Sequence, residues 1–138
     1  MITSKRTSPK KTQPVGPRPT QGELEILAVL WRRGPSSVRD VHVELEQLRA
    51  MGYTTVLKLL QIMTEKGLVE RDERQRTHIY AARAPRDETQ RQLLDDLLER
   101  AFAGSAATLV MQALATHRAS RQELDAIRRM LDEMDGGR

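Results

Sequence analysis

The fold of this chain is decided by residues 52–69, which read GYTTVLKLLQIMTEKGLV. One set of side chains follows the i, i+3, i+4, i+7 spacing of a single apolar helix face: Val56, Leu59, Leu60 and Met63. The opposite face carries hydrogen-bonding groups and a cation: Thr54, Lys58, Gln61 and Glu65. Gly67 ends the helix, and a strand-like run follows it. The stretch therefore predicts a helix over 54–66, with one face held to a core and the other suited to reading base edges in a DNA major groove.

A second predicted helix stands immediately before this one. Ser36 or Ser37 supplies its N-cap, and apolar residues follow at helical spacing as far as Ala50: Val38, Val41, Leu45 and Leu48. Met51-Gly52 then makes a turn into helix 54–66. Two helices joined by a short turn that contains glycine form a helix-turn-helix.

A further helix is predicted upstream, from Thr20 to the Gly34-Pro35 break. Thr20 with Glu23 three residues later has the pattern of a capping box. Its expected inward stripe, flanked by Ile26 and Leu30, consists of Leu24, Leu27, Ala28 and Trp31. We therefore expect this helix to be buried over more than half of its circumference.

Two strand-like runs, 68–71 and 77–81, follow helix 54–66, with the polar tip DERQR at 72–76 between them. A hairpin directly after a reading helix is typical of the wing of a winged helix, whose tip lies against the sugar–phosphate backbone. The alternative is a solvated hairpin with no binding role, because Asp72 and Glu73 partly cancel the arginines. We predict that the helix and the wing contact DNA through Thr54, Thr55, Leu57, Lys58, Gln61, Arg71, Arg74 and Arg76.

The helix residues of this set are expected to have separate roles. Thr54, Lys58 and Gln61 should lie nearest the bases. Thr55 should lie close to a phosphate at the helix N-terminus, where the helix dipole favours an anion. Leu57, on the flank, suits contact with a thymine methyl group.

The pattern after Pro85 is helical throughout. Three short amphipathic helices are predicted over 87–103, over 106–117 and from Ser120 onward. A layer this thin cannot enclose a core alone, so we expect two copies to bury its apolar residues mutually in a two-fold homodimer. The alternative is packing onto the winged domain of the same chain. The predicted dimerisation residues are Leu93, Leu97, Leu98, Phe102, Leu109, Leu124, Ile127 and Leu131.

Composition limits the class of protein. The chain has 138 residues, of which 38% are hydrophobic, so one domain with a small appendage is expected. The absence of cysteine excludes disulfides, thiolate metal sites and a cysteine nucleophile. The longest apolar run, Ile26 to Trp31, is far shorter than a membrane span, and the N-terminus lacks the apolar region of a secretory signal. We therefore expect a cytoplasmic protein without membrane insertion.

The net charge of +4 is unevenly distributed. Residues 1–19 hold five Lys or Arg and no acid, residues 20–85 hold ten against nine Asp or Glu, and residues 86–138 hold eight against ten. We predict a disordered basic tail over 1–19, a winged-helix DNA-binding domain over 20–85 and a three-helix dimerisation region over 86–138. The tail either solubilises the chain or touches DNA phosphates.

The order and spacing of these motifs resemble those of the BlaI/MecI/CopY-type penicillinase repressors over about residues 20–134. The resemblance is carried by GELEIL at 22–27, YTTV at 53–56, EKGLV at 65–69 and SRQEL at 120–124. It implies a homodimeric winged-helix transcriptional repressor that occupies a palindromic operator in double-stranded DNA. In the best-known members it also implies a membrane sensor with a metalloprotease domain, which cleaves the repressor in its C-terminal helices.

The chain departs from the resemblance at two functional points. The copper-responsive branch carries a C-terminal cysteine motif, and the absence of cysteine excludes that switch here. The Asn-Phe pair that is cut in the proteolysed members corresponds to Gln112-Ala113. Control by proteolysis is therefore left open, with Gln112 and Ala113 as the candidate positions.

Other classes of function are weaker interpretations. An enzyme is not expected, because His42, His78 and His117 fall on separate elements and the sequence has no phosphate-binding glycine loop. No cofactor or metal is expected either. A winged-helix docking module for another protein and a transcriptional activator remain alternatives, although the polar helix face and the arginine-bearing tip favour DNA as the ligand.

Overall fold

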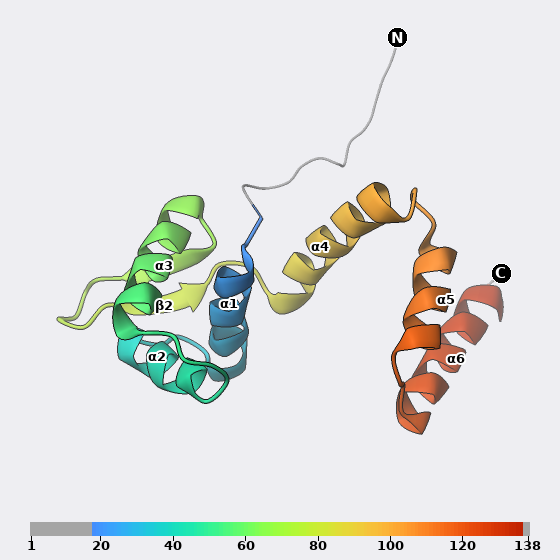
Figure 1. The fold of residues 1–138 in the computed structure, drawn as a ribbon, viewed down its shortest axis with the longest axis horizontal. Coiled ribbons are helices and arrows are strands. Elements are labelled where there is room, and N and C mark those ends of the chain that lie inside the picture. The colour runs from blue at the N-terminus through green and yellow to red at the C-terminus, as the bar shows by residue number, and fades with distance from the viewer. Residues whose placement is uncertain (1–17, 137–138) are drawn as a thin grey trace, which may run out of the picture. The chain divides into compact units, whose positions relative to one another are not determined.

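The structure, a computed structural model, describes residues 18–136, so the predicted basic tail over 1–19 lies outside the described residues except for Arg18 and Pro19. The described chain is mainly helical with one small hairpin, which confirms the predicted fold class (Figure 1). It divides into two compact units between Leu93 and Leu94, a boundary that falls within the fourth helix. The elements in chain order are α1 (Gln21–Arg33), α2 (Val38–Glu46), α3 (Tyr53–Lys66), β1 (Val69–Asp72), β2 (Ile79–Ala82), α4 (Arg86–Ala101), α5 (Ala106–Thr116) and α6 (Arg121–Gly136).

The first unit is a winged head in which α1, α2 and α3 surround one hydrophobic core (Figure 1). The predicted stripe of α3 lies in this core: Val56, Leu60 and Met63 are fully buried, and Leu59 packs against the core while partly exposed. Gly67 ends α3 with φ 82°, and its N–H donates to the carbonyls of Met63 and Thr64. A left-handed residue at this place is the usual helix stop, and it favours glycine. Both predictions for this helix are confirmed.

The core face of α1 differs from the predicted one. The capping box is present, with Thr20 N donating to Glu23 Oε1 at 2.9 Å and Glu23 N to Thr20 Oγ1 at 3.3 Å. However, the most buried apolar residues of α1 are Ile26, Leu27, Val29 and Leu30, whereas Leu24, Ala28 and Trp31 are partly exposed. The predicted stripe was therefore wrong by a rotation of about one residue. The reason is that α1 packs against α2, α3 and β2 together, which moves its core face toward Ile26 and Val29.

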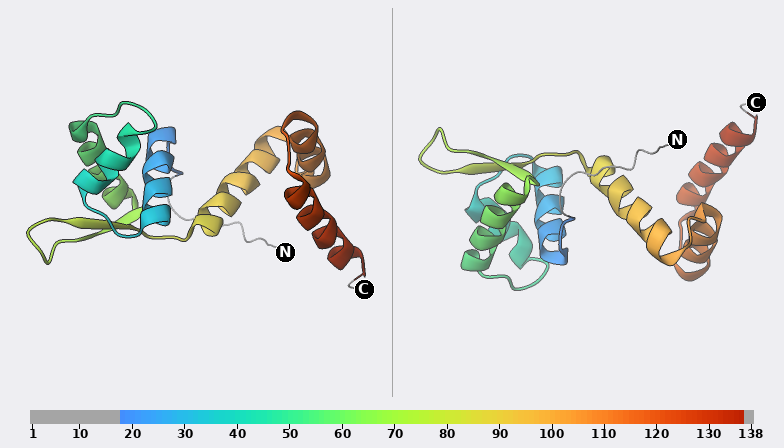
Figure 2. Two further views of the ribbon diagram at one scale, coloured as in Figure 1. Left: turned by 90° about the horizontal axis from the view of Figure 1, so that it is seen from below. Right: turned by 90° about the horizontal axis from the view of Figure 1, so that it is seen from above.

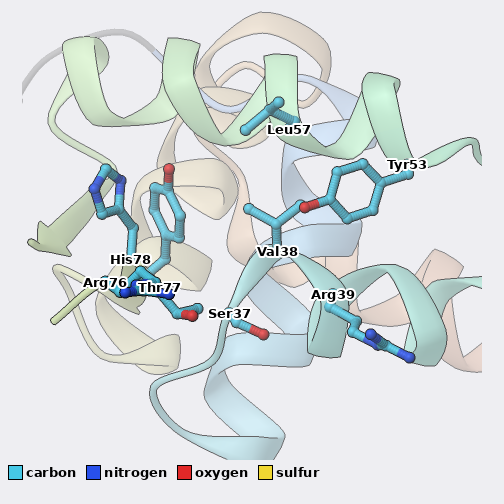
Figure 3. A pocket seen from close by; sticks show the side chains of 9 residues that line it. Ser37, Val38, Arg39, Tyr53, Leu57, Arg76, Thr77 and His78 are labelled. Carbon is cyan, nitrogen blue, oxygen red and sulfur yellow. The ribbon is translucent and has the colours of Figure 1, made fainter.

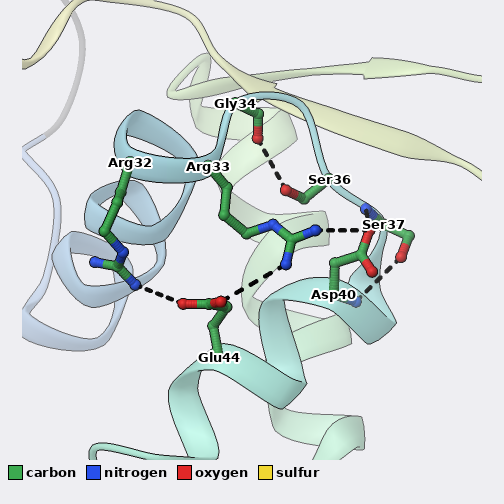
Figure 4. A network of polar contacts seen from close by, with 7 residues as sticks. All are labelled: Arg32, Arg33, Gly34, Ser36, Ser37, Asp40 and Glu44. Carbon is green, nitrogen blue, oxygen red and sulfur yellow. Dashed lines mark hydrogen bonds and ion pairs between the residues drawn. The ribbon is translucent and has the colours of Figure 1, made fainter.

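A polar network fixes the corner between α1 and α2 (Figure 4). Ser37, not Ser36, is the N-cap of α2, and it forms a capping box with Asp40. The backbone N–H and the side chain of Ser37 lower the pKa of Asp40, because both hydrogen-bond to its charged carboxylate. Two arginines from the last turn of α1 also reach Glu44 on α2, at 2.8 Å from Arg32 and 3.7 Å from Arg33. Ser37 therefore anchors the start of α2, and the two arginines hold its last turn to α1.

The second helix is shorter than predicted. It ends at Glu46 rather than near Ala50, and Leu48, expected on its apolar stripe, is 70% exposed. The N–H groups of Leu48 and Arg49 both bond to the carbonyl of Leu45, which tightens the chain into a turn. Met51 then returns to the core. The prediction for Leu48 was wrong because the turn into α3 begins before that residue.

The hairpin is antiparallel, with Val69 opposite Ala82 and Asp72 opposite Ile79. Its connecting loop projects away from the three helices (Figure 2). Thr77 and His78, predicted on the second strand, lie in this loop instead. Tyr80 on β2 exchanges two backbone hydrogen bonds with Ser36, at 2.8 and 2.9 Å. This bridge connects β2 to the segment between α1 and α2, and so holds the wing to the helical core. It fixes the position of Tyr80, and with it the register of β2.

The remaining helices begin and end close to their predicted limits. Ser105 caps α5, and Ser120 with Glu123 forms a capping box at α6. The α4 helix ends two residues before the predicted Ala103, which adopts φ 50° and is followed by Gly104 at φ 80°. Neither α5 nor α6 has a buried residue among the described part of the chain. The predicted helices thus form, but this chain alone gives them no core.

Candidate nucleic-acid interface

The α3 helix presents a polar face to solvent. Thr54, Lys58 and Gln61 are exposed, while the buried stripe on the other side fixes the helix to the core. Within residues 18–136, no ion-pair partner is found for Lys58. The predicted reading residues are therefore brought together on one free surface.

The N-terminus of α3 is also accessible. Gly52 is its N-cap and supplies no side-chain hydrogen bond, so the first N–H groups of the helix have no capping side chain. Thr54 and Thr55 are exposed beside them. The positive end of the helix dipole at this place favours an anion such as a phosphate.

Tyr53 is a residue of this surface that the sequence analysis did not select. It is the first residue of α3 and is 48% exposed. The His42 ring of α2 meets the Tyr53 ring edge-on, with the ring centroids 5.8 Å apart and the planes at 80°. His42 Nε2 lies 3.2 Å from Glu46 Oε2. The contact with His42 thus holds the phenol ring in place on an otherwise polar surface. The sequence analysis missed Tyr53 because residues 42 and 53 lie on different helices, and no local pattern pairs them.

Two of the three predicted wing arginines are engaged by acids of the same hairpin. Arg74 Nη2 lies 2.8 Å from Asp72 Oδ2, and Arg71 Nε lies 2.6 Å from Glu73 Oε2. The hydrogen bonds from Arg74 lower the pKa of Asp72 to about 2. Hydrogen bonds to Tyr80 and Glu73 raise the pKa of Arg71. Arg76, by contrast, has no ion-pair partner among the described residues, so its charge is available to an external anion.

A groove of about 570 Å³ lies between the start of α2, the start of α3 and the wing loop (Figure 3). Its walls include Val38 and Leu57, and Tyr53 stands between α3 and α2. The polar residues of its rim include Arg39 and Arg76, from α2 and from the wing loop. Leu57, which was predicted to contact DNA, therefore lies in the groove, partly exposed.

A partly buried ion pair joins α3 to α1. Lys66 Nζ, on the last residue of α3, lies 2.7 Å from Glu23 Oε1 on α1. The Glu23 side chain is 2% exposed and that of Lys66 is 20% exposed. From sequence Glu23 was expected only as a capping residue; its second role depends on a residue 43 positions away.

The predicted dimerisation residues lie on α4, α5 and α6, apart from Phe102, which directly follows α4. None of the eight is buried, and Leu97 and Leu131 are 47% and 57% exposed. Further large apolar side chains are exposed on these helices, namely Leu94, Val110, Met111, Leu114, Met130 and Met134. The candidate cleavage positions Gln112 and Ala113 are exposed on α5.

Within residues 18–136, no group of three or more His, Asp or Glu side chains is placed to hold a metal ion. No helix of the described part of the chain has the length and apolar character needed to cross a membrane.

Comparison with known proteins identified relatives of this chain. The solution structure of the DNA-binding domain of the repressor BlaI matches with a TM-score of 0.48 and 20% identity, over 55% of this chain and 93% of that one. The "Transcriptional regulator BlaI" of Mycobacterium tuberculosis is 37% identical over 122 residues, which are 84% of this chain and 86% of the relative. The family described as "Penicillinase repressor" matches residues 19–133. The chain belongs to the penicillinase repressor family.

The repressor also resembles a more distant relative. The "Penicillinase repressor" of Bacillus licheniformis is 20% identical to it over 117 residues, which cover 85% of this chain and 91% of that one. The family match spans the winged head, α4, α5 and α6 as far as residue 133. The resemblance seen in the sequence motifs is thus confirmed, and the chain is a transcriptional repressor of winged-helix type.

Proposed function

We propose that this repressor binds DNA sequence-specifically as a homodimer, with α3 of each copy in a major groove of a palindromic operator. The observation that carries the proposal is the two-sided α3 helix. Its apolar stripe is locked in the core, while Thr54, Lys58 and Gln61 are exposed on the other side. Lysine pairs with guanine and glutamine with adenine through the major-groove edges of the bases.

Phosphate contacts are proposed to fix the register of α3 on the duplex. Thr55 and the uncapped N-terminus of α3 offer hydrogen-bond donors at the positive end of a helix dipole. Leu57, two residues further along α3 and partly exposed, suits contact with a thymine methyl group. In the wing, Arg76 offers a free guanidinium, whereas Arg74 and Arg71 are held by Asp72 and Glu73. These contacts orient the protein and carry no base preference of their own.

The homodimer is proposed from the apolar surface of the C-terminal helices. Side chains such as Leu97, Leu131 and Met134 are between 47% and 69% exposed in one copy. Exposed apolar side chains of this number mark an interaction surface. A closed two-fold pair covers the same surface on both copies and places two heads on half-sites separated by about 10 or 20 base pairs.

The experiment is a binding assay with two duplexes, one from the region upstream of the repressor's own gene and one of random sequence. Lys58→Ala and Gln61→Ala should weaken binding to the upstream duplex more than to the random one, by roughly 1–3 kcal/mol for each base contact that is lost. Arg49→Ala is the matched control, since it removes an exposed cation of the head outside α3. If Lys58→Ala and Arg49→Ala weaken both duplexes equally, α3 is not the reading helix.

Release of DNA by proteolysis is proposed only from the resemblance to the family. The repressor would then act in the cytoplasm beside a membrane sensor with a metalloprotease domain, which would cut near Gln112-Ala113. The test is an immunoblot of the repressor before and after induction, in cells with and without that protease. A chain that stays intact while its target promoters are active excludes this route.

A further inference from the structure

The two sides of the wing differ sharply in charge. The groove between the wing, α2 and α3, called here the inner groove, is lined by nine residues, none of which is Asp or Glu. Seven of the nine have a side chain that can donate a hydrogen bond, the exceptions being Val38 and Leu57. Its two arginines, Arg39 and Arg76, have no ion-pair partner among the described residues. The inner groove is therefore built for an anion.

The other side of the hairpin, called here the outer face, carries three carboxylates, on Glu70, Asp72 and Glu73. Its arginine Arg74 is paired with Asp72. Arg71 is paired with Glu73, but it stands opposite Tyr80 in the strand register, so its side chain starts from the same face as that of Tyr80. The strand register explains part of this separation. Successive side chains of a strand point to opposite faces, so Glu70 and Asp72 lie on the face opposite to that of Tyr80, which lines the inner groove. An approaching phosphate is repelled on the outer face and attracted on the inner one.

The inner groove also has shape and apolar surface. Val38 and Leu57 form its floor, and the Tyr53 ring stands against them, with His78 on the other side (Figure 3). Contact with His42 at 5.8 Å holds the Tyr53 ring, so little side-chain freedom is lost when the hydroxyl binds a ligand. An apolar floor with hydrogen-bond donors and cations around it matches a deoxyribose ring with its two phosphates.

We propose that the inner groove seats the sugar–phosphate backbone of one DNA strand. Tyr53 and His78 donate hydrogen bonds to phosphate oxygens from opposite sides, and Arg39 and Arg76 neutralise the phosphate charge. The outer face, with Arg74, points away from the duplex. This inference rests on the proposed function, because it takes α3 to lie in the adjoining major groove. It adds Arg39, Tyr53 and His78 to the residues that contact the DNA backbone, and it makes Arg76 rather than Arg74 the main DNA contact of the wing.

The test is fluorescence anisotropy of the full chain with the upstream duplex and the random duplex over a range of salt concentrations. Tyr53→Phe removes one hydroxyl and keeps the ring against His42. It should weaken binding to both duplexes by the same factor, about 3- to 10-fold, as expected for one lost hydrogen bond. Arg39→Gln should reduce the slope of log K against log salt by about 0.9, which corresponds to one phosphate contact.

The matched control is Arg74→Gln, which changes the charge equally but on the outer face. It should reduce the salt slope far less than Arg39→Gln does. If Arg74→Gln lowers the slope as much as Arg39→Gln, or if Tyr53→Phe binds like the parent protein, the inner groove is not the seat. If Lys58→Ala nevertheless loses its preference for the upstream duplex, the proposed function is still supported and only the assignment of the inner groove fails. If no variant changes binding to either duplex, both proposals fail together.

Discussion

Lys66→Met should destabilise the winged head by about 2–4 kcal/mol. The substitution keeps the aliphatic stem but removes the ammonium group that lies 2.7 Å from Glu23 Oε1. The Glu23 carboxylate, 2% exposed, is then left with a buried and uncompensated charge. Loss of one partner of a fully buried ion pair costs about 3–5 kcal/mol. The lower range applies here because Lys66 is 20% exposed and Thr20 N still donates to Glu23.

Two further variants separate this charge effect from ordinary truncation. Arg49→Met breaks an ion pair of similar length, 2.9 Å to Glu25, whose side chains are 54% and 23% exposed. A surface pair of this kind contributes about 0–1 kcal/mol. The double variant Glu23→Gln with Lys66→Met should be more stable than Lys66→Met alone, because the amide oxygen still accepts from Thr20 N and no buried charge remains.

The assay is urea unfolding followed by the fluorescence of Trp31, the only tryptophan of the chain. Trp31 Nε1 donates to the carbonyl of Ala84 at 2.9 Å, so its signal reports on the head, which both residues belong to. With a slope of about 1–3 kcal/mol per molar urea, the midpoint should fall by on the order of 1–2 M. Equal shifts for Lys66→Met and Arg49→Met would refute the argument from burial.

Three more outcomes are expected from other parts of the structure. Leu97→Asp and Leu131→Asp should give monomers in sedimentation with the head still folded, because both side chains are exposed in the single chain; an unchanged mass would argue against the proposed dimer. Gly67→Ala should lower the free energy of unfolding by about 1 kcal/mol, because alanine is strained at a φ of 82°. Steric overlap adds nothing, since the added Cβ meets only Arg83 Nη1, at 3.8 Å. The urea midpoint measures this loss, and an unchanged midpoint would mean that the helix end adapts. Asp72, with its pKa lowered to about 2, should stabilise the wing above pH 3.8 and lose that contribution as the pH falls through about 2. Arg74→Ala should return its NMR titration midpoint toward 3.8, and a midpoint that stays near 2 would show that Arg74 is not the cause.

The features that the sequence predicted well depend on neighbours within four residues. The capping boxes at Thr20 and Ser120 need only a carboxylate three residues later. The end of α3 at Gly67 needs only a residue that accepts a positive φ. The polar face of α3 follows from the helical repeat once its apolar stripe is recognised. Such interactions are encoded in short windows of the chain, so they could be predicted without its fold.

The features that the sequence missed join distant positions. The core face of α1 depends on its packing against three other elements, and the register of β2 depends on the bridge between Ser36 and Tyr80. The ion pair between Glu23 and Lys66 and the ring contact between His42 and Tyr53 likewise have no local signal. No pattern within one helix or strand reports which residue of another element will meet it.

The sequence by itself determined the existence and order of the helices and the wing, because hydrogen bonds and apolar repeats along a short segment fix each of them. Only the tertiary structure decided that Lys66 of α3 meets Glu23 of α1, since the two residues are 43 positions apart in the chain. It also brought residues 37–39, 53–57 and 76–80 to one groove. Charge and shape at that groove arise from three segments at once, and no single segment contains them.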